Sequence, residues 1–425
     1  MAFCKRPTMR DDLHEALPFS EDASVLSTPI VIEEKTVPNR ICYQPMEGCD
    51  GTASGAPDEL TRRRYIRFAN GGAGLIWFEA TAIVNEGRAN PRQLYLHESN
   101  CDAFERLIVD IKNTCVKENG YEPVIVCQLT HSGRWSKPEG APAPLIAYNK
   151  PIFEKEPIRS EAIVSDSYLD SLLERYEISA RLCERAGFDG VDIKACHGYL
   201  LSELLNAYQR KGRYGGCYEN RTRLLMDAVS AVKSACSRDF IVSSRFNAYD
   251  GYSYPYGIGD SGTYGVPDFT EAARIALDLQ KNGASLLNVT MGCPYTNNEV
   301  NRPTCFAEKD MPYDSIERMI SGAAAVKKSA DRAAVVLSGI SFLGALAPNV
   351  AGASILRGDC DLAGFGRQIF SYPELARDII RNGEMSQNKL CLTCGKCTEL
   401  MRSKSAPGCV VHDKLYLDLY KQIKK

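Results

Sequence analysis

The segment "VIVCQLTH", residues 124–131, is one of eight short apolar runs, rich in β-branched residues, that recur along this 425-residue chain. The others begin at Arg40 ("RICYQPM"), Gly74 ("GLIWFEATAI"), Gly190 ("GVDIKACH"), Phe240 ("FIVSSRFNA"), Ser285 ("SLLNVTMG"), Ala334 ("AVVLSGI") and Asp361 ("DLAGFGRQ"). Runs that are apolar at almost every position are typical of parallel strands buried on both faces. The sequence therefore predicts a parallel sheet.

Amphipathic stretches with helical spacing separate these runs, namely "DELTRRRYIRFANGG", "YLDSLLERYEISARLCERAG", "FTEAARIALDLQKNG" and "YDSIERMISGAAAVKKSA". Eight strand–helix repeats predict an α/β fold of the (β/α)8 TIM-barrel type. Two Rossmann-like halves are the alternative, but "RICYQPMEGCDG" lacks the phosphate-binding glycine pattern expected after a first strand. The literal G-x-G-x-x-G match "GIGDSG", residues 257–262, follows a turn-rich aromatic stretch, so we interpret it as a flexible loop.

The composition is that of a globular protein, with 44% hydrophobic and 24% charged residues and a formal net charge of -2. The chain has no long run of one charge sign, so its charge pattern does not indicate a nucleic-acid partner. Neither a signal peptide nor a membrane-spanning segment is evident. Thirteen of the seventeen cysteines are scattered, which is typical of a reducing compartment. We therefore expect a cytoplasmic protein without nucleic-acid or membrane partners.

Polar side chains and glycines stand where the predicted strands end. In TIM barrels the chemistry lies at this C-terminal face, and glycines there allow backbone N–H groups to approach a phosphate. These strand ends predict one converging site. Its candidate residues are Pro45, Met46, Ala80, Thr81, Gln128, His131, Lys194, His197, Tyr199, Arg245, Ser338, Gly339, Gly366 and Arg367.

Four cysteines near the end of the chain have the spacing of metal ligands, in "CLTCGKC" (391–397) and at Cys409. Structural zinc sites usually use two well-separated cysteine pairs, whereas C-x2-C-x2-C runs are familiar in iron–sulfur proteins. We therefore predict a [4Fe–4S] cluster held by Cys391, Cys394, Cys397 and Cys409, with zinc or free thiols as the alternatives. The polar, glycine-bearing residues between them predict a tightly wrapping loop.

Several motifs resemble the old yellow enzyme family of FMN-dependent oxidoreductases. They are the Pro-Met pair after the first strand, "QLTHSGR" (128–134), "CHGYLLSELLNAYQRKGRYGGCYENRTR" (196–223) and "GFGRQIFSYPEL" (364–375). The four-cysteine tail resembles the iron–sulfur branch, which includes 2,4-dienoyl-CoA reductase, enoate reductase and trimethylamine dehydrogenase. The resemblance implies an FMN-binding barrel over residues 25–385, an N-terminal extension over 1–24, and a short cluster-binding tail over 386–425.

The resemblance also implies roles for the strand-end residues. FMN would be held by Pro45, Met46, Ala80, Gln128, Arg245, Gly339, Gly366 and Arg367, with Arg245 stabilising the reduced ring and the glycines holding the phosphate. His197 would bind the substrate carbonyl, and Tyr199 would act as proton donor. Where the family usually has a first histidine this chain has Lys194, which is able to polarise a carbonyl, pair with a substrate carboxylate or turn away.

The function implied by the resemblance is an ene-reductase, in an anaerobic setting, that transfers a hydride from N5 of reduced FMN to an α,β-unsaturated carbonyl compound. The longer relatives carry a further FAD and nicotinamide domain, and no such domain fits in the sixteen residues after Cys409, where "HDKLYLDLYKQIKK" predicts one short helix. We therefore expect a separate redox protein to supply electrons through the cluster.

Three alternatives to this function stay open at the level of the sequence. Direct reduction of FMN by NAD(P)H and an amine or N-methyl dehydrogenase that passes electrons outward are the enzymatic alternatives, and a non-catalytic subunit is the third. The loops "APAPLIAYNKPIFEKEP" and "YDGYSYPYG" are expected to overhang the site and select the substrate, but they do not identify it. The sequence is compatible with a homo-oligomer and does not establish one.

Overall fold

The eight predicted strands form a closed, parallel barrel. The protein is described by a computed structural model that covers residue 13 and residues 16–154, 156–263, 265–301 and 312–424. Within these residues the barrel order is β10–β3–β4–β5–β6–β7–β8–β9. The bounds are β3 (Ile41–Tyr43), β4 (Leu75–Ala82), β5 (Val124–Thr130), β6 (Gly190–Ile193), β7 (Ile241–Tyr249), β8 (Leu286–Met291), β9 (Ala334–Leu337) and β10 (Leu362–Phe365). The TIM-barrel prediction is confirmed.

Burial on both faces explains the continuous apolar runs in the sequence. Every residue of β4 and of β5 is buried. Alternate side chains, such as Trp77 and Val126, fill the inside of the barrel, while their neighbours Phe78 and Cys127 pack against the surrounding helices. A strand with two buried faces has no position where a polar residue is favoured, so the sequence shows no alternation.

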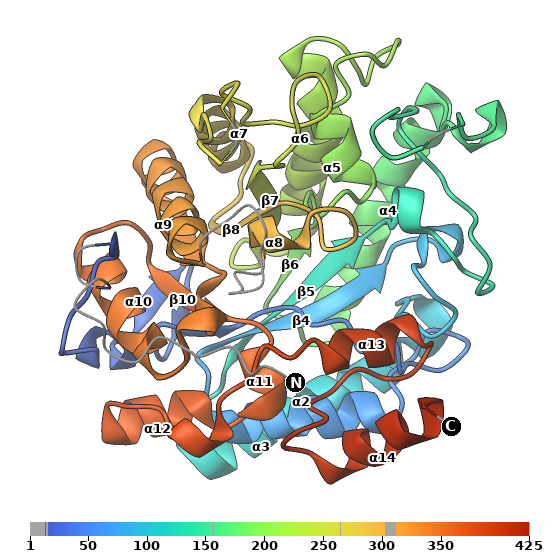
Figure 1. Ribbon diagram of the computed structural model, residues 1–425. Helices are drawn as coiled ribbons and strands as arrows, with labels where there is room; N and C mark the ends of the chain where they lie inside the picture. The colour runs from blue at the N-terminus through green and yellow to red at the C-terminus, as the bar shows by residue number, and fades with distance from the viewer. Residues whose placement is uncertain (1–12, 14–15, 155, 264, 302–311, 425) are drawn as a thin grey trace.

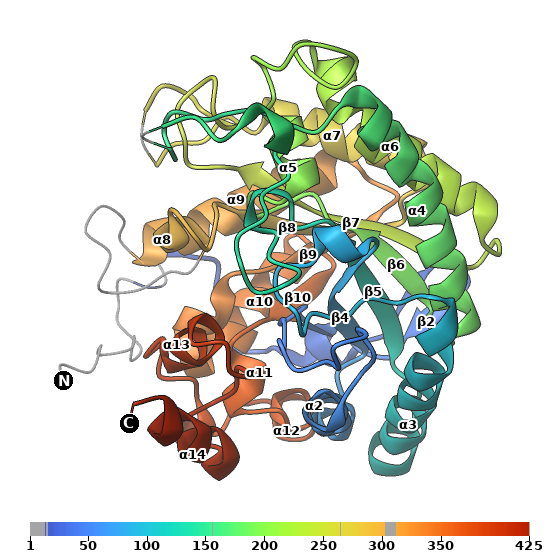
Figure 2. The same cartoon turned by 90° about the vertical axis from the view of Figure 1, so that its right-hand side faces the viewer.

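Helices surround the barrel, as Figures 1 and 2 show. The longer ones are α2 (Glu59–Gly71), α3 (Cys101–Asn119), α4 (Asp166–Arg185), α6 (Tyr218–Ala235), α7 (Thr270–Lys281), α9 (Pro312–Ser329) and α10 (Ala347–Leu356); the short ones are α5 (Leu200–Leu205) and α8 (Asn298–Asn301). Helix α2 begins with a capping box between Asp58 and Thr61 and ends at Gly72, whose φ of 78° is left-handed. No described helix has the length and apolar character needed to cross a membrane.

An antiparallel hairpin, β1 (Ile30–Ile32) with β2 (Lys35–Val37), closes one end of the barrel. Ile32 and Val37 pack among Leu75, Val124 and Ile241, which are the first residues of β4, β5 and β7. The hairpin therefore plugs the N-terminal end and leaves the C-terminal end as the open one. The sequence analysis did not predict it, because two three-residue strands have too short a pattern to be distinguished from a loop.

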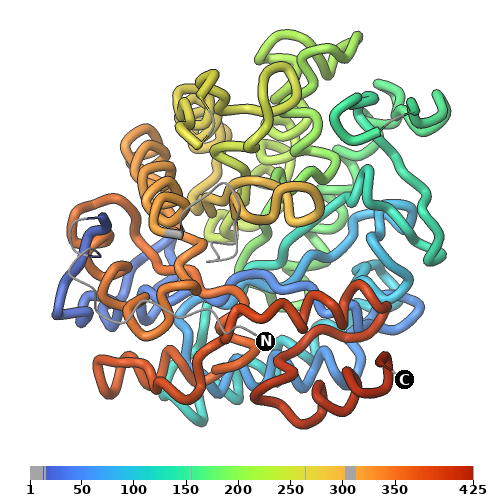
Figure 3. Tube along the Cα trace, in the orientation of Figure 1, coloured from blue at the N-terminus to red at the C-terminus, as the bar shows by residue number. Residues whose placement is uncertain are grey.

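The C-terminal segment, which follows β10, contains four described helices: α11 (Gln368–Ser371), α12 (Leu375–Asn382), α13 (Lys396–Arg402) and α14 (Lys414–Ile423). Figure 3 follows this segment as a red trace across one side of the molecule. Helix α14 confirms the short helix predicted after Cys409. The expectation of a loop through the cysteine run is wrong in part, because α13 begins at Lys396, between Cys394 and Cys397.

This segment is anchored on α2 by a buried carboxylate. Asp413 is 7% exposed and accepts hydrogen bonds from Arg63, at 2.9 Å, and from Arg67. Its carboxylate also caps α14 through the backbone N–H of Leu415. The Arg63 guanidinium lies over the ring of Tyr416, which packs in a small apolar cluster with Leu400, Ala406 and Val410. Helix α2 thereby connects the barrel to the cysteine-bearing segment.

Replacing Asp413 by alanine should loosen this segment without unfolding the barrel. The change removes two ion pairs and a helix cap, which are together worth about 2–4 kcal/mol. We expect amide hydrogen exchange in residues 390–423 to accelerate by at least tenfold, measured by mass spectrometry. Asp418→Ala is the control, since Asp418 is exposed and its ion pair with Lys421, at 3.8 Å, lies on the surface. Equal exchange in the two variants would contradict the anchoring role.

Candidate functional site

One cavity lies at the C-terminal end of the barrel, and its walls combine the strand ends with the C-terminal segment. The structure brings every predicted cofactor- and substrate-binding residue to this cavity: Pro45, Met46, Ala80, Gln128, Lys194, His197, Tyr199, Arg245, Gly339, Gly366 and Arg367. Parallel strands in a closed barrel all end at the same face, so residues far apart in sequence meet there. The individual roles of these residues stay predictions.

Asp192, buried inside the barrel, orients two of the residues expected to hold a flavin ring. Its carboxylate accepts hydrogen bonds from Gln128 Nε2 at 2.6 Å, from Trp77 Nε1 at 2.9 Å and from the backbone N–H of Arg245 at 2.6 Å. With its Nε2 committed to Asp192, the Gln128 amide can offer its oxygen to a ligand. The buried Arg245 Nε has no hydrogen-bond partner among the described residues, so it could donate a hydrogen bond to the polar edge of a flavin ring.

Gly339 after β9 and Gly366 after β10 line the cavity and have no side chains to fill it. A Cβ on Gly366 would lie 3.5 Å from Met46 Sδ, which is an ordinary contact, so the protein packing itself does not require glycine there. Gly339 has a left-handed φ of 87° and carries the chain from β9 into the following turn. Together with Arg367 these positions fit the expected phosphate end of FMN, because they combine open space with a cation.

Lys194 carries a buried ammonium that has no hydrogen bond or ion pair with any described residue. The side chain is 5% exposed, lines the cavity, and has its Nζ 3.6 Å from the ring centroid of Tyr199. Burial lowers the pKa of Lys194, although nearby Cys196 and Glu47 act in the opposite direction. A buried cation without a partner is costly, so this ammonium is suited to a ligand that brings an oxygen with negative charge.

His197 and Tyr199 follow Lys194 on the same loop. The His197 Nε2 lies 3.1 Å from Thr290 Oγ1, and the residue has a left-handed φ of 64°, a conformation that costs about 1 kcal/mol in a non-glycine residue. The Tyr199 hydroxyl lies 3.0 Å from the Tyr295 hydroxyl, and Trp135 stacks on Tyr295 at 4.3 Å. Burial raises the pKa of Tyr199, which keeps its proton available for donation.

The cavity residues that the sequence analysis missed include Glu47, Thr290 and Tyr295. Thr290 stands near the end of β8, so the strand-end rule should have found it. Glu47 directly follows the predicted Pro-Met pair, and its carboxylate accepts a hydrogen bond from Asn90 at 3.0 Å. Burial raises the pKa of Glu47 and Lys194 opposes this shift. Tyr295 comes from the loop after β8, where the sequence has no comparable signal.

Three expectations differ from the structure. Thr81 does not line the cavity, since its side chain is buried and donates a hydrogen bond to the Glu79 carbonyl oxygen at 3.0 Å. The strand-end residue His131 turns away from the cavity and lies 2.8 Å from the Tyr168 hydroxyl, and burial lowers its pKa to about 4. The two loops expected to overhang the site do meet, through Phe153 and Tyr252 at 5.1 Å, but in the described residues neither loop lines the cavity. The "GIGDSG" stretch lies in the irregular segment between β7 and α7, as expected of a loop.

The four cysteines lie at the edge of this cavity and on the adjoining surface. Cys397 lines the cavity together with Met46, Cys394 is exposed, and the others are partly buried. Backbone N–H groups point at two sulfurs, from Thr393 to Cys391 at 3.4 Å and from His412 to Cys409 at 3.4 Å. Such N–H donors fit thiolate ligands of a cluster.

Charge interactions also connect these thiols. Burial raises the pKa of Cys409 to about 11, and Cys391 and Cys394 are near enough to add to this shift. In the described residues no three His, Cys, Asp or Glu side chains converge on a single metal-ion position. The thiols are therefore neighbours, but they are not gathered around one ion.

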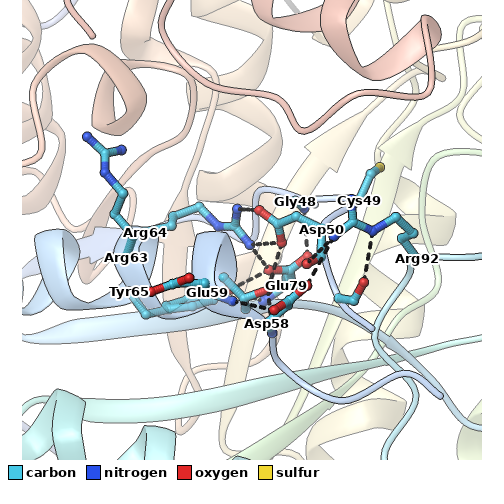
Figure 4. A network of polar contacts seen from close by, with 12 residues as sticks. Gly48, Cys49, Asp50, Asp58, Glu59, Arg63, Arg64, Tyr65, Glu79 and Arg92 are labelled. Atoms are coloured by element: carbon cyan, nitrogen blue, oxygen red, sulfur yellow. Dashed lines mark hydrogen bonds and ion pairs between the residues drawn. The ribbon is translucent and has the colours of Figure 1, made fainter. Parts of the chain in front are cut away.

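A buried ion network holds the cavity loop in place (Figure 4). Arg64 of α2 donates to Asp50 and to Glu79, and the Glu79 carboxylate accepts the backbone N–H of Gly48 at 2.6 Å. Burial alone would raise the pKa of Asp50, but Arg64 holds it below its ordinary value, whereas burial raises that of Glu79 to about 7. One guanidinium thus fixes both β4 and the loop that carries Pro45, Met46 and Glu47.

Comparison with known proteins gives consistent matches. The model of the NADH:flavin oxidoreductase / NADH oxidase family matches residues 25–385. An NADPH dehydrogenase of Geobacillus sp. (strain WCH70) is 31% identical over 277 residues, covering 63% of this chain and 73% of that protein. An NADPH dehydrogenase of Bacillus subtilis (strain 168) is 33% identical over 217 residues, covering 50% of this chain and 60% of its own.

Solved structures share the fold at low identity. A 2-naphthoyl-CoA reductase in complex with 2-naphthoyl-CoA has a TM-score of 0.77 at 18% identity, covering 93% of this chain. Histamine dehydrogenase from Rhizobium sp. 4-9 has a TM-score of 0.70 at 19% identity, covering 91%. This chain spans 58% and 52% of their lengths. An old yellow enzyme homologue from Zymomonas mobilis has a TM-score of 0.65 at 24% identity, covering 85% of this chain and 94% of its own.

Replacing Arg64 by methionine should destabilise the barrel strongly. Two buried carboxylates would lose their cation, and breaking a buried pair of this kind costs about 3–5 kcal/mol. We expect this loss in chemical denaturation, and we expect it to grow from about pH 5 to pH 8 as the carboxyls ionise. The control is Arg62→Met, whose exposed pair with Asp110 should be worth below about 1 kcal/mol. Equal losses in the two variants would show that the network is not stabilising.

Proposed function

Since the chain belongs to the NADH:flavin oxidoreductase / NADH oxidase family, we propose that this flavin-dependent oxidoreductase is an ene-reductase that acts on α,β-unsaturated carbonyl compounds. The observation that carries this proposal is the buried Lys194 ammonium, which lies over the Tyr199 ring and has no ion pair with any described residue, in the same cavity as Gln128 and Arg245. A cation next to a proton donor is the arrangement that reduction of a conjugated alkene requires.

Gln128, Arg245, Gly339, Gly366 and Arg367 would hold FMN, which in its reduced form would supply the hydride for the β-carbon of the alkene. Lys194 and His197 bind the carbonyl oxygen, where negative charge develops, and the Thr290 hydroxyl holds the His197 imidazole. Tyr199 donates the proton to the α-carbon, and its raised pKa keeps it in the protonated form. Arg245, which lines the cavity, would stabilise the anionic reduced ring through its positive charge. Tyr199 and Tyr295 line the cavity, with Trp135 stacked on Tyr295, and this aromatic wall suits a flat, conjugated acyl group.

We propose further that the four cysteines hold a [4Fe–4S] cluster that exchanges electrons with the flavin. Cys397 and Met46 lie in the walls of the same cavity, which supports this proposal because the cluster and the flavin would then be neighbours. The alternative donor is NAD(P)H acting directly on the flavin, as the names of the NADPH dehydrogenase relatives suggest.

An amine dehydrogenase is the second candidate, favoured by the aromatic grouping of Trp135, Tyr199 and Tyr295 and by the structural likeness to histamine dehydrogenase. Aromatic faces attract cationic amines. In this cavity, however, the Lys194 ammonium already lies over the Tyr199 ring and would repel a second cation. The balance of charge in the pocket therefore favours the ene-reductase.

An anaerobic titration separates these functions. We expect an enone, an enoate or an enoyl thioester to reoxidise the dithionite-reduced protein, with one alkene consumed per flavin. The visible absorbance of the flavin measures the reoxidation. Reduction of the oxidised protein by histamine or trimethylamine would identify an amine dehydrogenase instead. A protein that reacts with neither class would overturn the proposed function.

Lys194→Ala tests the assignment of the substrate side. Losing a charge-assisted hydrogen bond to the developing oxyanion should lower kcat/KM by about 10- to 100-fold. The FMN content should remain unchanged, since Lys194 is on the substrate side of the predicted site. Lys211→Ala, at an exposed position, is the control. Unchanged kinetics in the Lys194 variant would remove this residue from the mechanism, and loss of FMN would move it to the cofactor site.

A further inference from the structure

Positive charge is concentrated in the C-terminal segment. Residues 386–425 contain eight Lys or Arg residues and three Asp or Glu residues, whereas the other 385 residues contain 43 and 50. The segment thus opposes the net charge of the rest of the chain. Such a separation of charge is a property of surfaces that steer a charged partner.

Apolar side chains are exposed at the cysteines themselves. Leu392 is 38% exposed and lies between Cys391 and Cys394, and Val411 is 42% exposed and lies two residues after Cys409. The two loops are tied together, since the His412 Nε2 lies 3.1 Å from the Leu390 carbonyl oxygen. The exposed apolar residues therefore belong to one region, around the exposed Cys394.

Lysines on α13 and α14 and on the turns that flank them add charge to this region. Lys404 and Lys414 are exposed and have no ion pair or hydrogen bond through their ammonium groups with any described residue; Lys396, partly exposed, lies over the Tyr420 ring at 5.6 Å. We define the tail surface as Leu392, Lys396, Lys404, Val411 and Lys414. Figure 1 shows α13 and α14 next to each other on one side of the molecule.

The acidic residues of the segment offset only part of this charge, since Glu399 is near enough to Lys396 for the lysine to help lower the pKa of that carboxyl. Asp413 is buried under Arg63 and Arg67, and Glu399 is paired with Tyr420 and with Lys424 at 3.1 Å. Asp418 has Lys421 within 3.8 Å. The lysines of the tail surface therefore keep their charge for a partner.

We propose that the tail surface is the docking site of a separate, acidic one-electron carrier protein. An apolar centre with a charged rim is the usual anatomy of a transient protein interface, and opposite charges raise the rate of encounter. The apolar centre lies at the cysteines, so a docked carrier would be next to the cluster. This inference rests on the proposed function, because it assumes that the cysteines hold a redox cluster.

The electron balance needs two encounters for each alkene. Each reduced carrier loses one electron at the tail surface, and two such electrons reach the flavin and leave with the hydride. The flavin takes up one proton from solvent, which leaves within the hydride, and Tyr199 donates the second proton of the product and is then reprotonated from solvent. No further oxidant or reductant is needed.

Binding and electron transfer can be measured with a plant-type [2Fe–2S] ferredoxin, an acidic one-electron carrier, as the probe. The variant is Lys396→Glu/Lys404→Glu/Lys414→Glu in the holoprotein. We expect its Kd for oxidised ferredoxin, by calorimetry, to rise at least tenfold, and the second-order rate constant of its reduction by reduced ferredoxin to fall at least tenfold. Carbodiimide cross-links from ferredoxin carboxylates should map to these three lysines in the unaltered protein.

The matched control reverses three cations elsewhere, Arg106→Glu/Lys117→Glu/Lys211→Glu, and should bind ferredoxin like the unaltered protein. Reduction by dithionite and iron content should be the same in both variants. Cys394→Ala should keep ferredoxin binding and lose electron transfer to the flavin. Docking that survives the tail-surface variant, electron transfer that survives Cys394→Ala, or equally tight binding of a DNA duplex at this surface would each overturn the inference.

The two proposals fail in different ways. If the reduced protein does not reoxidise with any unsaturated carbonyl compound but ferredoxin binding still depends on the three lysines, the ene-reductase is wrong and the docking surface stands. If enones are reduced but ferredoxin neither binds nor transfers electrons, the docking surface is wrong and the ene-reductase stands. A second copy of this chain on the tail surface would appear as a dimer that the triple charge reversal abolishes, and it would overturn the carrier proposal.

Discussion

Arg64 is the point on which the open end of this barrel depends. Its guanidinium is buried, and it holds two carboxylates, one on β4 and one on the loop after β3. That loop contains Pro45, Met46 and Glu47, which line the cavity. A buried ion pair gains little net stability over an apolar contact, but losing one partner is costly, so the network fixes one geometry and penalises others.

The same helix also positions the C-terminal segment. Arg63 and Arg67, one residue before and three after Arg64, hold Asp413 and so bring α13, α14 and the cysteines to the rim of the cavity. The short arginine-rich stretch of α2 thereby couples the wall of the flavin site to the place where a cluster would lie. Electron transfer depends steeply on distance, and a rigid connection of this kind would keep that distance constant.

The interior of the cavity shows a different compromise. The Lys194 ammonium, which no described residue pairs with a negative charge, and the left-handed backbone of His197 both reduce stability where they stand. The N-terminal hairpin and the fully buried strands offset this cost from the opposite end of the barrel. Strain and unsatisfied charge are concentrated where a ligand would relieve them, and the remainder of the structure is ordinary close packing.

The sequence by itself determined the eight strands, five of the helices and the residues at the strand ends. Parallel strands buried on both faces leave a continuous apolar run, and barrel closure then brings every strand end to one face. Only the tertiary structure decided which of these side chains turn inward: Lys194 does, and His131 does not. It also decided the hairpin plug, the cavity residues Glu47 and Tyr295, and the docking of the tail on α2. These features depend on contacts between segments far apart in the chain, and such contacts leave no periodic pattern in the sequence.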